Sequence, residues 1–191
     1  MHDNVKRLVE TSNSLYNDKI VSGKSGNISI RLNQYIAITP TLKSLGHLKE
    51  EDIVLVDMDG NCLTKGKPSS EVEMHLAIYK KRNDVNAIIH VHSPYITGFA
   101  FSDKKIKRLE GFGQINQKYL SYIDYEKPGS KELALSASEG IKDEDVLILK
   151  NHGMICVGEN LKEAESLTMF IEESAKTQFV SIMLNSVKDI E

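Results

Sequence analysis

The stretch Ala87-Ile88-Ile89-His90-Val91-His92 is an almost continuous apolar run that carries two histidines. With Asn86 before it and Pro94 after it, the run predicts a buried β-strand. Side chains at positions i and i+2 of a strand project from the same face. We therefore expect His90 and His92 to lie on one face of a sheet, where both imidazoles can reach a single ion.

Other elements are predicted on both sides of this run. Helical spacing of apolar residues marks the segments 5–16, 72–82, 97–101, 130–140 and 161–183, whereas 102–128 has no clear pattern. Short apolar segments predict two strands at 28–32 and 35–38, which pair across a turn. Further strands are predicted at 53–56, before the hairpin signal Asp59-Gly60, and at 146–149 and 154–157. Because turns link most early strands and helices come later, this order favours a mostly antiparallel sheet covered by helices over a doubly wound fold.

The composition is that of an ordinary globular protein. The 191 residues suit a single domain over 1–191, and no repeat or linker divides them. A net charge of −3 provides no basic field for nucleic acid or an anionic membrane, and no segment reaches the length of a membrane span. Cys62 and Cys156, each in or near an apolar run, predict buried free thiols in a reducing compartment. We expect a cytoplasmic protein without a nucleic-acid or membrane partner.

A third histidine is a candidate ligand for the same ion. His152 lies in Asn151-His152-Gly153, directly after the predicted strand 146–149. Strand ends beside a glycine are common places for a ligand that approaches the backbone closely. Three neutral imidazoles with an open fourth position form the usual catalytic zinc site, although the pattern alone also fits three unrelated histidines. The weaker candidates are His2, His47 and His75.

The segment Pro68-Ser69-Ser70-Glu71-Val72-Glu73 begins a predicted helix. Ser70 and Glu73 match a capping box, which is a purely structural explanation. A helix N-terminus also favours a phosphate, here with the hydroxyls of Ser69 and Ser70 around it. Glu71 would then lie beside the bound anion, where a carboxylate can serve as a general base.

Two further segments contain donors of the kind that an anion pocket uses. Ser25-Gly26-Asn27 precedes a predicted strand, and Thr39-Pro40-Thr41 follows one. Each alone reads as a turn, but together they supply hydroxyl, amide and backbone donors. The sequence lacks a Walker-type loop, a GxSxG elbow and a GxGxxG motif. Their absence argues against nucleotide hydrolysis, serine hydrolysis and dinucleotide binding.

Five motifs, taken in chain order, resemble the class II aldolase/adducin family. They are SGNIS (Ser25–Ser29), ITPT (Ile38–Thr41), KPSSE (Lys67–Glu71), HVHS (His90–Ser93) and KNHG (Lys150–Gly153). The motifs have the family's order and about its spacing over nearly the whole chain. The resemblance implies a three-layer α/β/α sandwich around a mostly antiparallel central sheet. It also implies a homotetramer with active sites at subunit interfaces.

The resemblance further implies a role for each matching residue. Three residues match the ligands of a zinc ion: His90, His92 and His152. Another divalent ion, such as Mn²⁺ or Co²⁺, can take the place of zinc. Glu71 matches the catalytic acid/base. The pocket for the phosphate of a small phosphorylated sugar is matched by Asn27, Thr41, Ser69 and Ser70. The family's aldolases also use an interfacial tyrosine as an acid in the region around Glu110, where this chain has none.

The activity that the resemblance implies is reversible aldol cleavage of a ketose 1-phosphate. The products are dihydroxyacetone phosphate and an aldehyde, formed through a metal-stabilised enediolate. Decarboxylation of a 3-oxo-tetronate 4-phosphate and epimerisation of a pentulose phosphate use the same groups and remain alternatives. Leu42, where the aldolases usually carry glycine, departs from their pattern, and Ser69-Ser70-Glu71 departs from that of the decarboxylases. A non-catalytic adducin-like assembly domain is disfavoured because the three histidines and Glu71 are all present.

Overall fold

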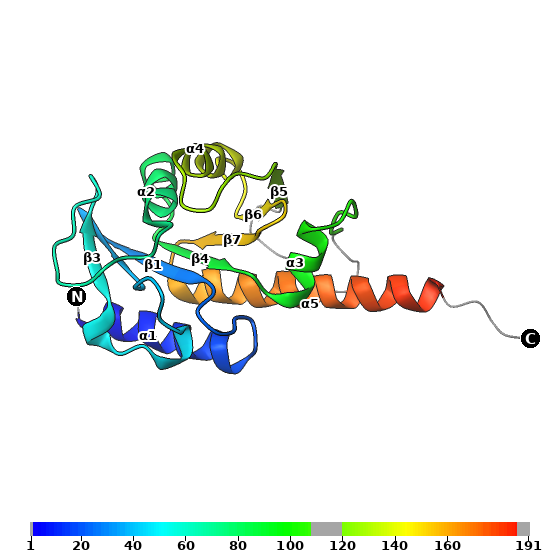
Figure 1. Cartoon of the computed structure of the whole chain (residues 1–191), viewed down its shortest axis with the longest axis horizontal. Helices are drawn as coiled ribbons and strands as arrows, with labels where there is room; N and C mark the ends of the chain where they lie inside the picture. The colour runs from blue at the N-terminus through cyan, green and yellow to red at the C-terminus, as the bar shows by residue number, and fades with distance from the viewer. Residues whose placement is uncertain (1, 108–119, 187–191) are drawn as a thin grey trace, which may run out of the picture.

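A seven-stranded sheet forms the centre of the molecule (Figure 1). The computed structural model describes residues 2–107 and 120–186. Its strands are β1 (Asn27–Leu32), β2 (Tyr35–Ile38), β3 (Val54–Asp57), β4 (Ala87–Val91), β5 (Leu120–Ile123), β6 (Val146–Leu149) and β7 (Gly153–Gly158). Their order across the sheet is β3-β2-β1-β4-β7-β6-β5. Every neighbouring pair is antiparallel except β5 and β6, which are parallel.

Helices cover both faces of this sheet. The described residues contain α1 (His2–Asn17), α2 (Val72–Lys81), α3 (Pro94–Ala100), α4 (Lys131–Gly140), α5 (Leu161–Ser186) and two 3₁₀ turns, η1 (Leu45–His47) and η2 (Glu50–Asp52). Helices α2 and α4 lie on one face, whereas α1, α3 and α5 lie on the other (Figure 1). The expected α/β/α sandwich with a mostly antiparallel sheet is therefore confirmed.

The central strand β4 has a buried side chain on each face of the sheet. Ile88 belongs to the core that contains Ile78 of α2, and Ile89 belongs to the core that contains Ile171 of α5. A strand covered on both sides reads as a continuous apolar run, which explains the sequence 87–91. Because side chains alternate along a strand, His90 projects to the same side as Ile88. Its imidazole therefore points toward the layer of α2 and α4.

Most of the predicted elements are confirmed, with one omission. The hairpin of β1 and β2, the buried strands β6 and β7, and the long helix α5 lie where the sequence places them. Strand β5 was not predicted, because all four of its residues are half-buried at the edge of the sheet. It has neither the apolar run of a central strand nor a clear alternation. Its parallel pairing with β6 supplies the regularity that its sequence lacks.

The predicted capping box of Ser70 with Glu73 is wrong. Helix α2 begins at Val72 with Glu71 as its N-cap residue, and no side chain caps it. Instead, Ser69 Oγ accepts a hydrogen bond from the backbone N–H of Glu71 at 3.3 Å. The position before the helix leaves the carboxylate of Glu71 free to turn toward the sheet. Likewise, the helix expected at 97–101 begins earlier, with Pro94 at its first position, where proline is favoured.

Two smaller expectations concern membranes and thiols. In 2–107 and 120–186, none of the helices combines the length and the apolar character needed to cross a bilayer. Cys62 is exposed, Cys156 is buried, and neither forms a disulfide. The prediction of free thiols is confirmed, but that of burial is wrong for Cys62.

Candidate metal centre and acid/base group

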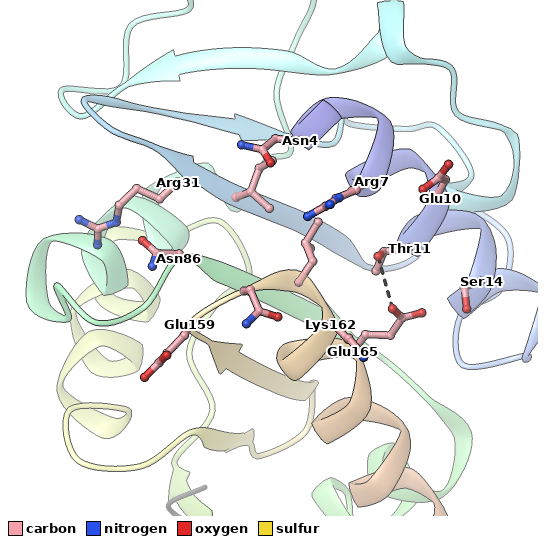
Figure 2. A pocket seen from close by; sticks show the side chains of 13 residues that line it. Asn4, Arg7, Glu10, Thr11, Ser14, Arg31, Asn86, Glu159, Lys162 and Glu165 are labelled. Carbon is pink, nitrogen blue, oxygen red and sulfur yellow. Dashed lines mark hydrogen bonds between the residues drawn. The ribbon is translucent and has the colours of Figure 1, made fainter. Parts of the chain in front are cut away.

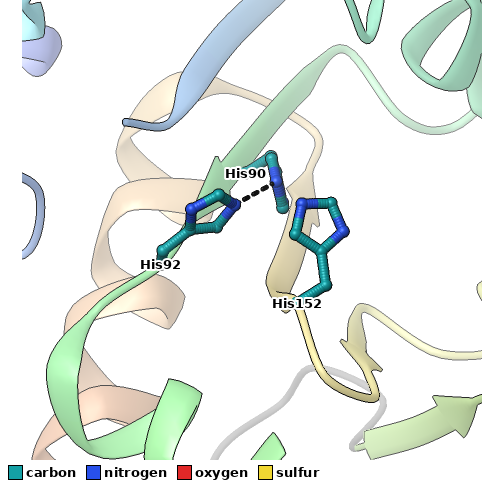
Figure 3. Close-up of side chains that lie close together, drawn as sticks. All are labelled: His90, His92 and His152. Atoms are coloured by element: carbon teal, nitrogen blue, oxygen red, sulfur yellow. Dashed lines mark hydrogen bonds between the residues drawn. The ribbon is translucent and has the colours of Figure 1, made fainter. Parts of the chain in front are cut away.

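Three histidines meet at one end of the central strands. His90 is in β4, His92 follows the end of β4, and His152 lies in the turn between β6 and β7. The antiparallel pairing of His90 with Ile155 and of Val91 with Met154 brings the start of β7 beside the end of β4. The ring centroids of each histidine pair are 4.8 Å apart (Figure 3). Their ligand nitrogens all lie within 4.8 Å of one another, a group that can hold a metal ion.

The turn before His152 explains how this histidine reaches the cluster. Asn151 has a φ of 55°, in the left-handed region that asparagine tolerates better than most residues. Its backbone N–H donates to the carbonyl of Ala100 at 2.9 Å, and that of His152 donates to the carbonyl of Leu149 at 3.0 Å. These bonds fix a tight reversal between β6 and β7. His152 is left only 9% exposed, and its ring is turned toward that of His90.

The protonation of His90 suits metal binding. Its Nδ1 lies 2.9 Å from the carbonyl oxygen of Met154, which can only accept a hydrogen bond. Nδ1 therefore carries a proton, which leaves Nε2 as the nitrogen that faces the cluster. Burial opposes a charged ring, but the carboxylate of Glu71 and the carbonyl of Met154 raise the pKa of His90, so a bound cation would take the place of the Nε2 proton. His92 Nε2 lies 2.9 Å from this nitrogen. Burial lowers the pKa of His92 to about 3 and that of His152 to about 4, so both rings are neutral near pH 7.

The carboxylate of Glu71 lies directly beside the cluster. Its Oε2 is 3.2 Å from His90 Nε2, and its Oε1 is 3.6 Å from His152 Nε2. Asn27 Nδ2 donates to Oε2 at 2.9 Å, and the residue is only 5% exposed. Burial raises the pKa of this carboxyl, but His90, Asn27 and His152 together hold the pKa well below its usual range. The group is therefore ionised in the native protein.

The donor set fits a divalent cation. Among the described residues, Glu71 Oε1 and His152 Nδ1 are buried without a hydrogen-bond partner. Such atoms are rare in native proteins, and an ion or an ordered water molecule at the cluster would satisfy them. Neutral imidazoles and carboxylate oxygens are ligands that Zn²⁺ takes, and other first-row divalent metals also accept imidazole. The histidines and the carboxylate thus form a site that can bind such an ion.

Three of the sequence motifs meet beside this centre. Pro40 and Pro68 form an isolated antiparallel bridge, in which Thr41 N–H donates to the carbonyl of Lys67 at 3.1 Å. The bridge places the segment 38–41 against the segment 67–71. Thr39 Oγ1 accepts a hydrogen bond from Ile28 N–H at 3.1 Å, which joins the segment 25–29 to the same corner.

The four residues expected to bind phosphate differ in their surroundings. Ser69 is buried, Thr41 is half-buried and Ser70 is exposed. Two of the four already contact Glu71: Ser69 Oγ accepts from the backbone N–H of Glu71, and Asn27 Nδ2 donates to the carboxylate of Glu71. Only one hydrogen of the Asn27 amide group is used in this way. Glu110, which marks the region where the family's aldolases carry a tyrosine that acts as an acid, lies outside the described residues.

One histidine has surroundings that the sequence did not reveal. His75, a weak candidate ligand from its sequence context, does not join the three clustered rings; its Nε2 lies 2.6 Å from Asn27 Oδ1. Its position four residues after Glu71 on α2 was the available signal, because residues at i and i+4 share a helix face.

A separate cavity of about 670 Å³ lies at the opposite end of the central strands (Figure 2). It is bordered by α1, the end of β1 and the start of α5, and Thr11 Oγ1 donates to Glu165 Oε2 across it at 3.4 Å. The guanidinium of Arg31 on its wall already donates to the carbonyls of Tyr79, Arg82 and Val85. No residue of the histidine centre lines this cavity.

An α/β/α sandwich that brings three imidazoles and a buried carboxylate together has the groups of a metal-dependent enzyme. Residues 6–179 match the family model of the Class II Aldolase and Adducin N-terminal domain, and the chain belongs to this family. The resemblance found from the five motifs is confirmed.

Several known proteins are similar over most of the chain. An L-fuculose phosphate aldolase of Methanocaldococcus jannaschii is 43% identical over 179 residues, which cover 94% of this chain and 97% of that protein. A 3-oxo-tetronate 4-phosphate decarboxylase of Haemophilus influenzae is 34% identical over 178 residues, with coverage of 90% and 85%. The crystal structure of L-fuculose-1-phosphate aldolase from Thermus thermophilus superposes with a TM-score of 0.89 at 23% identity and full coverage of both chains. At that identity the last likeness shows the fold alone.

Proposed function

We propose that this protein is a metal-dependent class II aldolase, a lyase that cleaves a ketose 1-phosphate reversibly to dihydroxyacetone phosphate and an aldehyde. The observation that carries the proposal is the position of Glu71, whose carboxylate oxygens lie 3.2 and 3.6 Å from two of three clustered imidazoles. The 43% identity to a relative named as an L-fuculose phosphate aldolase supports this reaction class.

The proposed metal ligands are His90, His92 and His152. Three neutral imidazoles with an open fourth position favour zinc, and Mn²⁺ or Co²⁺ are the alternatives to compare. A bound ion supplies a Lewis acid, which stabilises the negative charge that develops on the substrate oxygens as the carbon–carbon bond breaks. The carbonyl of Met154 holds the proton of His90 on Nδ1, so that Nε2 faces the cluster.

Glu71 is the proposed acid/base group. In the condensation direction the ionised carboxylate can accept a proton from the carbon of dihydroxyacetone phosphate that will form the new bond, and in the cleavage direction it returns a proton to that carbon. Burial keeps bulk water from competing for that proton, and Asn27 holds one of the two oxygens in place.

The proposed phosphate pocket consists of Asn27, Thr41, Ser69 and Ser70. The bridge between Pro40 and Pro68 places the chain segments of these hydroxyls side by side. A substrate anchored there by its phosphate presents its reacting carbon to Glu71 in a fixed orientation, and such an orientation can supply several kcal/mol of the barrier reduction.

Decarboxylation of a 3-oxo-tetronate 4-phosphate is the second candidate, because a relative of that name is 34% identical over most of the chain. Two assays on the zinc-loaded protein separate the candidates. The first measures condensation of dihydroxyacetone phosphate with a panel of short aldehydes, and the second measures CO₂ release from a 3-oxo-tetronate 4-phosphate. Condensation without CO₂ release is expected. Release of CO₂ without condensation would assign the decarboxylase instead. The absence of both activities would refute both assignments.

We also propose that the chain, as one domain, forms a cytoplasmic homotetramer with active sites at subunit interfaces. Support comes from the end of α5, which extends beyond the sheet (Figure 1) and exposes the large apolar residues Phe179, Val180, Met183 and Leu184. Burial of such a patch in an assembly would be favourable. Sedimentation equilibrium should give about four times the chain mass of 21.4 kDa, whereas the mass of a monomer would refute the tetramer.

A further inference from the structure

A row of alternating hydrogen bonds links the helix that follows Glu71 to strand β1. Glu71, His75 and Tyr79 are spaced four residues apart and so lie on one side of α2, facing the sheet. Asn27 and Ser29 lie on the facing side of β1, two residues apart. The side chains interdigitate in the order Glu71, Asn27, His75, Ser29, Tyr79, with successive distances of 2.9, 2.6, 2.7 and 2.9 Å.

The direction of each bond in this row follows from the chemistry of its members. The ionised carboxylate of Glu71 can only accept, so the NH₂ group of Asn27 faces it. The carbonyl Oδ1 of Asn27 therefore faces His75, and His75 must donate from Nε2. His75 Nδ1 then carries a lone pair and accepts from the hydroxyl of Ser29.

The burial of the row prevents other partners from replacing these bonds. Ser29, His75 and Tyr79 are 0% exposed, and Asn27 is 6% exposed. Burial also lowers the pKa of His75 to about 3, which keeps the ring neutral and able to accept at Nδ1. If the Nε2 donor were missing, Asn27 Oδ1 would be a buried acceptor without a partner, and the amide would lose the contact that distinguishes its two orientations. With the amide reversed, Oδ1 would face the carboxylate of Glu71, which is repulsive.

We propose that His75 is a positioning residue for the reaction: it holds the amide of Asn27, which in turn holds the carboxylate of Glu71 in line with the three histidines. The inference rests on the proposed acid/base role of Glu71. His75 does not touch the reacting atoms. Its effect passes through one intermediate residue, so it should change the rate of proton transfer more than it changes metal binding or substrate affinity.

The test compares variants of the zinc-loaded protein by the exchange of a C–H hydrogen of dihydroxyacetone phosphate with deuterium from solvent. His75→Leu should lower kcat for exchange about tenfold or more and leave bound zinc unchanged. KM should rise by a smaller factor, because Asn27 also belongs to the proposed phosphate pocket. His75→Gln, which keeps an N–H donor, should recover most of the loss. Ile78→Ala is the matched control: this buried residue on the same helix belongs to the apolar core, so its substitution should lower stability and leave kcat near the wild-type value.

A double-mutant cycle distinguishes positioning from general structural support. If His75 acts through Asn27, then His75→Leu added to Asn27→Ala should cause no further loss of kcat. An additive loss, or a wild-type kcat in His75→Leu, would overturn the inference. Glu71→Gln is measured in parallel to separate the two proposals. Wild-type exchange in that variant would refute the acid/base role itself. Loss of exchange in Glu71→Gln together with wild-type exchange in His75→Leu would refute only the role of His75.

The wild-type protein provides a test that does not depend on how well a variant folds. ¹⁵N-edited NMR of labelled histidine side chains reports which ring nitrogen carries the proton. The inference requires a neutral His75 protonated at Nε2. Protonation at Nδ1 would reverse the amide of Asn27 and would contradict the proposed arrangement.

Discussion

Gly153 packs so closely against His92 that no side chain fits between them. A Cβ atom at position 153 would lie 2.6 Å from His92 Cδ2 and 2.5 Å from the carbonyl oxygen of Val91. Real Cβ atoms essentially never make contacts under 3.0 Å, so the backbone or the ring would have to move. Because Gly153 is next to His152 in the chain, this contact couples the positions of two of the three clustered histidines.

Substitution of this glycine should weaken metal binding. Gly153→Ala is expected to raise the dissociation constant for zinc at least about tenfold, since displaced supporting contacts typically have effects of that size. A competition titration against a chromophoric chelator measures the constant. Gly98→Ala is the control, because a Cβ there meets nothing within 4 Å. It should keep the wild-type affinity and, in a helix, add about 0.5–1 kcal/mol of stability. Wild-type affinity in Gly153→Ala would contradict the packing argument.

Removal of the charge of Glu71 should separate metal binding from proton transfer. Glu71→Gln keeps the size of the side chain and an oxygen that can accept from Asn27. We expect it to retain zinc but to lower C–H exchange of dihydroxyacetone phosphate by about 10²–10⁴-fold, the usual contribution of a general base. Deuterium incorporation followed by NMR measures the rate. Glu73→Gln, two residues away and exposed, should exchange at the wild-type rate.

The carboxylate of Glu172 anchors the segment that follows His92. It accepts hydrogen bonds from Ser93 Oγ at 2.7 Å and from the backbone N–H groups of Tyr95 and Ile96 at 2.9 Å each. Glu172→Ala would leave these donors buried without a partner. It should lower the free energy of unfolding by roughly 2–4 kcal/mol, measured in urea.

A neighbouring glutamate provides the control for that experiment. Glu173 is 59% exposed and pairs with Lys176 at 3.6 Å, the kind of surface ion pair that contributes little. Glu173→Ala should therefore change the free energy of unfolding by less than about 1 kcal/mol. Equal losses in the two variants would mean that the contacts of Glu172 do not determine its effect.

The two thiols should differ sharply in reactivity. Burial raises the pKa of Cys156 to about 12, so it carries almost no thiolate near pH 8, whereas Cys62 is exposed. In a titration of the native protein with Ellman's reagent, Cys62 should react rapidly and release the reagent's chromophore. Cys156 should react only after unfolding in guanidinium. Cys62→Ser should abolish the rapid phase. Rapid reaction of both thiols would show that the core around Cys156 opens readily.

The central strands could be predicted from the sequence because they are covered on both faces. Segments such as 87–91 and 146–149 are continuous apolar runs between polar residues, and few other structures explain that pattern. The edge strand 120–123 could not be predicted, because its half-buried residues gain their regularity only from pairing with β6. Helix α2 begins at Val72 as expected, but its cap was wrongly predicted, because a capping box in sequence does not fix which residue actually caps the helix.

The convergence of the three histidines was predictable in part. The spacing of His90 and His92 follows from strand geometry, but the approach of His152 depends on the pairing of β4 with β7, which links residues more than 60 positions apart. The contacts of His75 could not be predicted, because they need the register between α2 and β1. Long-range register of this kind is set by the packing of whole layers and leaves little trace in local sequence.

The most direct test of the account is the number of divalent ions bound per chain. The protein is purified from zinc-supplemented medium, freed of loose metal by gel filtration and measured by mass spectrometry of the elements. We predict about one zinc per chain in the wild type and almost none in a variant with His90, His92 and His152 all replaced by alanine. Far less than one ion per wild-type chain, or the same metal content in both proteins, would contradict the metal centre on which the proposed function depends.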